Sequence, residues 1–96
     1  NIKNLYINTG KNMLSIKVVC KDSIRCRDLE KLCITFCKEN EIKADIQYVS
    51  SLEEISALGI TNYPCLIIND RIYSSDKLPT RHTVENWIKE NAGVNV

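Results

Sequence analysis

The sequence predicts an α/β domain with the element order β-α-β-α-β-β-α, in which three helices flank a four-stranded mixed sheet. Three observations predict this class. A β-branched run at 14–19 leads into an amphipathic stretch at 23–40 and a second strand-like run at 44–49. A short helix follows, announced by a capping box. Two further apolar runs flank Asn69-Asp70, a pair that suits a tight hairpin turn.

The first three elements form a strand–helix–strand unit. On a helical wheel of the 23–40 stretch, one arc gathers apolar side chains, whereas the charged ones lie away from it. The arc holds Cys26, Leu29, Leu32, Cys33 and Phe36, with Cys37 at its edge. A strand, a long helix and a second strand predict that the strands 14–19 and 44–49 are parallel, with a right-handed crossover.

The second half begins with a helix opened by Ser51 and Glu54, the two ends of a capping box. We expect this helix to bury Leu52, Ile55 and Leu58, and Gly59 is a suitable residue to end it.

Two strands, 65–68 and 71–74, complete the predicted sheet. Pro79-Thr80 then opens a final helix whose inward face is Val84, Trp87 and Ile88. His82 falls in the first turn of this helix, where a solvent-facing position is expected. Residues from 91 onward are expected to fray.

The chain is long enough for one domain, which we place at 14–91. Residues 1–13 are expected to form an N-terminal extension that is flexible or derived from an expression vector. Leu5-Tyr6-Ile7 within it is a candidate edge strand, and Met13 is an alternative native start. Residues 92–96 are expected to form a C-terminal tail.

Composition favours an ordinary globular protein, with 44% hydrophobic and 26% charged residues. A net charge of +1 gives no electrostatic basis for binding nucleic acid or an anionic membrane. No apolar run approaches the roughly 18 residues of a membrane span. The five cysteines are an odd number in an α/β chain, which favours reduced thiols and a cytoplasmic location. No set of residues has convincing metal-ligand spacing.

The element order, together with Tyr63-Pro64 directly before the third strand, resembles the thioredoxin fold. The chain is similar to small thioredoxin-like and glutaredoxin-like redox-active disulfide proteins over residues 15–90. That family carries a CxxC motif at the start of the first helix, and here the matching positions are Ser23 and Cys26. The resemblance implies that Pro64 is cis and that the backbone of Tyr63 binds an extended peptide.

The resemblance aligns Ser23 with the attacking cysteine of the family and Cys26 with the resolving one. A serine hydroxyl cannot replace a thiolate in disulfide exchange. Ser23 is therefore expected to cap the helix, and its origin stays open between a natural residue and a replacement of cysteine or selenocysteine. Cys26 would then form intermolecular adducts or pair with another thiol.

The other cysteines have simple structural interpretations. Cys20 is expected to be a small apolar residue at a strand end, and a disulfide with Cys26 is an alternative that needs α-carbons within about 7 Å. Cys33 and Cys37 are expected in the core. Cys65 is expected to pack in the central sheet, although its place beside Pro64 leaves a redox role open.

Three functions follow from this sequence. The first is a thiol–disulfide oxidoreductase impaired by Ser23, which needs no metal or organic cofactor. The second is a redox-inactive thioredoxin-like module that binds peptides or proteins, and the third is a single-thiol redox sensor based on Cys20 or Cys26, which predicts an intramolecular disulfide on mild oxidation. The expected partners of a monomeric domain are a protein or small disulfide, glutathione, or a thioredoxin reductase. The physiological substrate and the reduction potential are not encoded in any motif.

Overall fold

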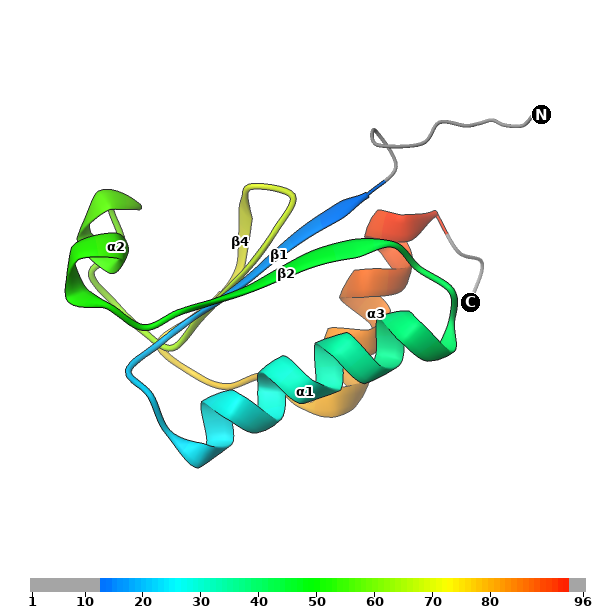
Figure 1. The fold of residues 1–96 in the computed structure, drawn as a ribbon, viewed down its shortest axis with the longest axis horizontal. Coiled ribbons are helices and arrows are strands. Elements are labelled where there is room, and N and C mark those ends of the chain that lie inside the picture. Colours follow the sequence, from blue (N-terminus) through cyan, green and yellow to red (C-terminus); the bar gives the residue numbers. More distant parts are fainter. Residues whose placement is uncertain (1–12, 94–96) are drawn as a thin grey trace.

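The computed structural model of the protein describes residues 13–93, and within that span the chain forms one mixed sheet with helices against it (Figure 1). The elements are β1 (Leu14–Val19), α1 (Ile24–Glu39), β2 (Ala44–Val49), α2 (Leu52–Ala57), β3 (Cys65–Ile68), β4 (Arg71–Ser75) and α3 (Arg81–Ala92). The predicted α/β class and element order are confirmed. The candidate edge strand at 5–7 lies outside the described residues.

The sheet order is β2-β1-β3-β4, so β1 lies at its centre. β1 pairs parallel with β2, as the strand–helix–strand unit predicts, and antiparallel with β3. β4 adds to β3 through the hairpin turn, where Asn69 and Asp70 have φ values of 50° and 66°. Asn69 also binds the start of β1, because its side-chain oxygen accepts a hydrogen bond from the Ser15 N–H at 3.0 Å.

One face of the sheet carries the larger core, covered by α1 and α3, which lie together on the lower side in Figure 1. The buried residues of this core are Leu14, Ile16, Val18, Cys20, Cys26, Leu29, Cys33, Phe36, Cys37, Leu66, Ile68, Val84 and Ile88. The predicted inward arc of α1 is therefore largely correct. Leu32 is only partly buried, whereas Cys37 is fully enclosed.

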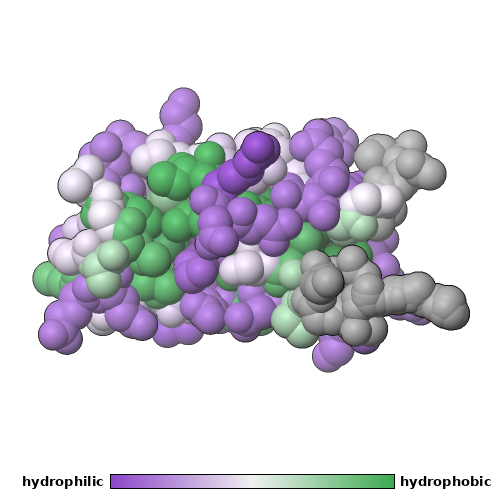
Figure 2. Space-filling model, turned by 90° about the horizontal axis from the view of Figure 1, so that it is seen from above, coloured by the Kyte–Doolittle hydropathy of each residue, from purple (hydrophilic) through white to green (hydrophobic). Residues whose placement is uncertain are grey.

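The other face carries a smaller core beneath α2, which lies on the opposite side in Figure 1. Ile55 is the residue of α2 that is buried there, with 2% of its surface exposed. The predicted burial of Leu52 and Leu58 is wrong, since these side chains are 65% and 42% exposed. The helix spans six residues, less than two turns, so few of its side chains can face the sheet. Figure 2 shows apolar surface gathered toward this end of the face.

Helix α3 is closed at both ends by local sequence. Thr80 caps its start by accepting a hydrogen bond from the Thr83 N–H, and Gly93 follows its end in the left-handed region with a φ of 73°. The helix runs to Ala92, beyond the position where fraying was expected. Asn91 is held in place because its side-chain amide donates to the Tyr73 hydroxyl at 2.8 Å and to the Trp87 carbonyl.

The contrast between Ile55 and Leu52 gives a stability test. Ile55→Ala should lower the free energy of unfolding by about 2–5 kcal/mol, because it removes buried methyl groups and leaves a cavity. Leu52→Ala in the same helix should change it by no more than about 0.5 kcal/mol. Urea unfolding followed by circular dichroism measures both. Equal losses in the two variants would contradict the packing of α2 described above.

Candidate functional site

A disulfide bond joins Cys20, just after β1, to Cys26 in the first turn of α1. Their α-carbons are 6.7 Å apart, within the limit that the sequence analysis set for this pair. Both residues are buried, with exposed fractions of 2% and 4%. The interpretation of Cys20 as an unpaired strand-end residue, and the expectation that all five thiols are reduced, are corrected here. The short connection turns α1 back over the end of β1, which brings the two sulfur atoms together.

Ser23 lies inside the ring that the disulfide closes, and it caps α1 as expected. Its hydroxyl oxygen accepts a hydrogen bond from the Cys26 N–H at 3.2 Å. Its carbonyl accepts one from the Arg27 N–H at 3.0 Å. The two residues that align with the family motif are therefore linked through the helix cap, while the sulfur of Cys26 is bonded to Cys20. The Ser23 hydroxyl therefore has a structural role as the cap of α1.

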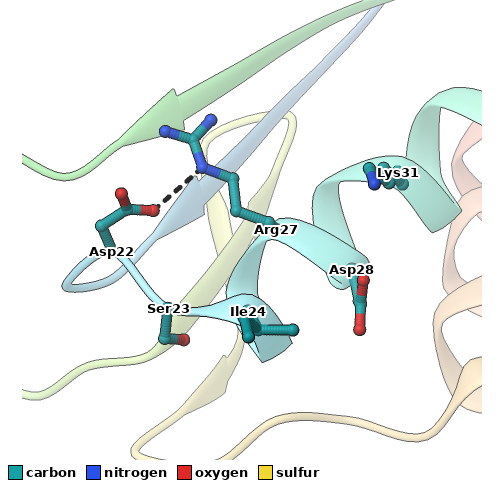
Figure 3. A pocket seen from close by; sticks show the side chains of 6 residues that line it. All are labelled: Asp22, Ser23, Ile24, Arg27, Asp28 and Lys31. Atoms are coloured by element: carbon teal, nitrogen blue, oxygen red, sulfur yellow. Dashed lines mark hydrogen bonds and ion pairs between the residues drawn. The ribbon is translucent and has the colours of Figure 1, made fainter.

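Three side chains hold the loop that precedes α1, and we name Asp22, Arg27 and Tyr48 the Asp22 cluster. Asp22 Oδ1 accepts a hydrogen bond from the Tyr48 hydroxyl at 2.8 Å and from Arg27 Nε at 2.9 Å. The Arg27 guanidinium carbon also lies 3.9 Å from the centroid of the Tyr48 ring. Figure 3 shows the Asp22 and Arg27 side chains pointing toward each other, with Ser23 and Ile24 turned away. The cluster ties the loop to both α1 and β2.

These contacts, together with burial, shift the pKa values of Asp22 and Tyr48. The hydrogen bond from Tyr48, followed by that from Arg27, lowers the pKa of Asp22 from its usual 3.8 because both favour the carboxylate. Burial raises the pKa of Tyr48, and its hydrogen bond to Asp22 adds to that shift. The hydroxyl therefore stays a proton donor and the carboxylate stays charged near neutral pH.

Tyr63 and Pro64 lie beside the disulfide. The β1–β3 register pairs Val19 with Cys65, so the next residues along the two chains, Cys20 and Pro64, come opposite each other. The Tyr63–Pro64 peptide bond is cis. Tyr63 is half-buried against both cores. Lys21 Nζ lies 5.9 Å from the centroid of the Tyr63 ring. The fold thus gathers the predicted site residues at one end of the sheet, with Cys65 on the other face: Cys20, Ser23, Cys26, Tyr63, Pro64 and Cys65.

The remaining cysteines are free and buried. Cys65 belongs to the core beneath α2, whereas Cys20 and Cys26 belong to the core on the other face, so the structure does not bring Cys65 to the disulfide. Burial raises the pKa of all three free thiols, to about 12 for Cys33. Thiols with such pKa values carry little thiolate at neutral pH and are unreactive.

His82 is exposed on α3 and lies 3.2 Å from the Asn86 side chain, as a solvent-facing residue would. Within residues 13–93, no three His, Cys, Asp or Glu side chains are grouped so that they could hold a metal ion. In the same span, no helix is both long and apolar enough to cross a membrane.

Sequence reasoning missed the Asp22 cluster. Tyr48 is 26 residues from Asp22, and no sequence motif connects the two positions. The available signal was the predicted parallel pairing. In that register Val18 pairs with Tyr48, so the end of β2 must lie beside the loop that follows β1.

The hydrogen bond between Tyr48 and Asp22 predicts a measurable pKa change. Tyr48→Phe should raise the pKa of Asp22 toward its usual 3.8, because it removes the contact that contributes most to the lowering. Carboxyl carbon chemical shifts followed by NMR across an acid titration report this pKa directly. Tyr73→Phe, which alters a hydroxyl bonded to Asn91 instead, is the matched control. An unchanged Asp22 pKa in Tyr48→Phe would contradict the contact.

Burial of the free thiols predicts slow modification. At pH 8 iodoacetamide should alkylate Cys33, Cys37 and Cys65 at least about a hundredfold more slowly in the folded protein than in urea, since reaction needs exposed thiolate. Mass spectrometry of timed samples measures each site. Rapid alkylation of Cys33 in the folded protein would show that its burial is incorrect.

Comparison with known proteins agrees with this architecture. A search of curated proteins finds no significant match to the chain. A family model described as a thioredoxin domain matches residues 14–89, which is most of the sequence. The match includes both halves of the site, the 20–26 ring and the Tyr63-Pro64 pair. The chain belongs to the thioredoxin-domain family.

Proposed function

We propose that this domain is a thiol–disulfide redox protein whose working couple is the Cys20–Cys26 pair. The observation that carries the proposal is the disulfide itself, which lies at the start of α1 opposite Pro64. In a thioredoxin-like protein this is the place where redox chemistry is expected. The sensor hypothesis from the sequence requires an intramolecular bond of this kind, so it merges with the oxidoreductase hypothesis into one two-thiol couple.

Ser23 sets the limit of this activity. An SxxC motif lacks the sulfur that attacks a substrate, so exchange through positions 23 and 26 is impaired whether the serine is natural or a replacement. Cys20 supplies a second sulfur from the other side of the loop. The first sulfur of the couple is thus three residues before the first position of the family motif, while Cys26 occupies the second, and Ser23 retains only its role in capping the helix.

The exchange reaction balances as a two-electron transfer. A thiolate of a partner dithiol attacks one sulfur of the Cys20–Cys26 bond, and the other sulfur leaves as a thiolate that takes up a proton. The partner's second thiolate then attacks the partner's own sulfur in the mixed disulfide, which forms the partner's disulfide and releases the second cysteine sulfur as a thiolate that also takes up a proton. The products are a Cys20–Cys26 dithiol and an oxidised partner. No metal or organic cofactor enters this sequence.

The partners that fit this chemistry are thiols and disulfides. A protein disulfide, a small disulfide such as glutathione disulfide, or the dithiol of a thioredoxin reductase would supply or accept the two electrons. In the cytoplasm, where we expect the domain to act as a monomer, the thiol pool would reduce the pair slowly because both residues are buried.

The same burial favours a second candidate, a redox-inactive module with a structural disulfide. Such a module would use the half-buried Tyr63 and Pro64, just before β3, to bind an extended peptide. It differs from the first candidate in one property. Its disulfide would remain oxidised under reducing conditions that leave the domain folded.

Redox titration distinguishes the two candidates. The folded protein is equilibrated in buffers of reduced and oxidised dithiothreitol, then trapped by alkylation and weighed by mass spectrometry. A redox couple should gain two labels, on Cys20 and Cys26, across a defined range of potential. Cys20→Ser should abolish this transition, and Cys65→Ser should leave it unchanged. A disulfide that stays oxidised in folded protein, even at the most reducing ratio, would overturn the redox proposal.

Restoring the family motif gives a second test. Ser23→Cys should create dithiol-dependent reduction of insulin disulfides, because it supplies the attacking thiol at the helix start. Turbidity of precipitating insulin measures the rate. Ser23→Thr preserves a hydroxyl cap without adding a thiol, so it should keep the rate of the unmodified chain and serves as the control. If the cysteine variant folds and remains inert, the assignment of position 23 to a thiol-exchange site fails.

A further inference from the structure

We propose that the Asp22 cluster is a latch that controls how readily the Cys20–Cys26 disulfide can be reduced. The inference rests on the proposed function, since it names the residues that regulate access to the same couple. Asp22, Arg27 and Tyr48 are positioning residues in this scheme. They contact neither sulfur through any hydrogen bond and act through the loop between the two cysteines.

The disulfide is closed off although the loop around it is open to solvent. Cys20 and Cys26 are buried, whereas residues 21–25, which connect them, are all exposed. An attacking thiolate must approach a sulfur atom along the S–S axis, so part of the structure around the buried bond has to move first, and the exposed loop that the disulfide closes is a part that neither core holds. Reduction of the folded protein therefore depends on local opening of residues 21–23.

The contacts that oppose this opening are concentrated on Asp22. Its Oδ1 atom accepts hydrogen bonds from β2, through Tyr48, and from α1, through Arg27. Arg27 is itself held from two sides. It lies over the Tyr48 ring, and it makes an ion pair of 3.4 Å with Glu30 in the next turn.

The other contacts of the loop are fewer. Ser23 caps α1, a bond that stays within the loop and the helix, and Lys21 lies over the Tyr63 ring at 5.9 Å from its centroid. Within residues 13–93, the loop is thus hydrogen-bonded to a side chain of a neighbouring strand through the Asp22 cluster. Removing it should free the loop while the sheet and both cores stay intact.

Reduction kinetics test the latch. Oxidised protein is exposed to excess dithiothreitol at pH 8, and labelling of Cys20 and Cys26 is followed by mass spectrometry. Tyr48→Phe keeps the ring under Arg27 but removes the hydroxyl, and should accelerate reduction about three- to tenfold, the range expected for one lost hydrogen bond. Tyr73→Phe removes a hydroxyl of equal hydrogen-bonding distance on β4, the opposite edge strand of the sheet, and should stay within about twofold of the unmodified chain.

A second variant and an internal control keep the test specific. Asp22→Ala removes both hydrogen bonds and should accelerate reduction at least as much as Tyr48→Phe. Labelling of Cys33, Cys37 and Cys65 in the same samples reports opening of the cores, and it should not accelerate. Faster labelling of all five cysteines together would mean that the variants loosen the whole domain, and would overturn the latch.

The outcomes separate the latch from the redox proposal. If both variants are reduced at the rate of the unmodified chain, the latch is overturned while the redox couple stands. If the unmodified disulfide resists reduction but both variants are reduced in folded protein, the latch is supported and the proposal of a freely cycling couple fails. Acceleration in both variants, with normal cycling of the unmodified chain, supports both.

Discussion

Hydrogen bonding of the central strand on both of its edges is the constraint on which the rest of this structure depends. β1 pairs in parallel with β2 and antiparallel with β3, and its residues Ile16, Val18 and Val19 are completely buried. Its face toward α1 and α3 is apolar throughout, with Leu14, Ile16 and Val18 in the larger core, whereas on the other face only Val19 is buried and Ser15 and Lys17 are partly exposed. β1 also fixes where the chain leaves the sheet. Cys20 follows directly, anchored by its N–H to the Val49 carbonyl at 3.0 Å.

The start of α1 combines two local constraints within one turn. Ser23 satisfies the N–H of Cys26, and Cys26 is joined covalently to the end of β1. A cap fixes the direction in which the helix leaves the loop, and the disulfide fixes its distance from the strand. The two act on the same residue. In the loop between them, the side chain of Asp22 is hydrogen-bonded to β2. This contact is the reason why we propose that the Asp22 cluster controls the opening of the loop.

Access to sulfur, more than thiol acidity, is the property that this site would regulate. In an exposed site the helix dipole and nearby cations set reactivity through the thiolate fraction. Here both sulfur-bearing residues are nearly inaccessible, and the free thiols have pKa values raised by burial. The rate at which such a buried couple is reduced would depend on how often the loop at residues 21–23 opens. Such a loop suits a slow switch better than a rapid reductant.

The sequence by itself determined the order of the elements, the inward arc of α1, the serine cap and the turn at Asn69-Asp70, because each depends on neighbours within a few residues. The sequence did not determine which side chains of α2 are buried, because a six-residue helix has too few turns for its pattern to show which of them face the sheet. Tertiary structure alone decided that Cys20 pairs with Cys26 and that Tyr48 meets Asp22. A disulfide depends on the relative placement of two α-carbons, and the Tyr48 contact depends on strand register between segments 26 residues apart.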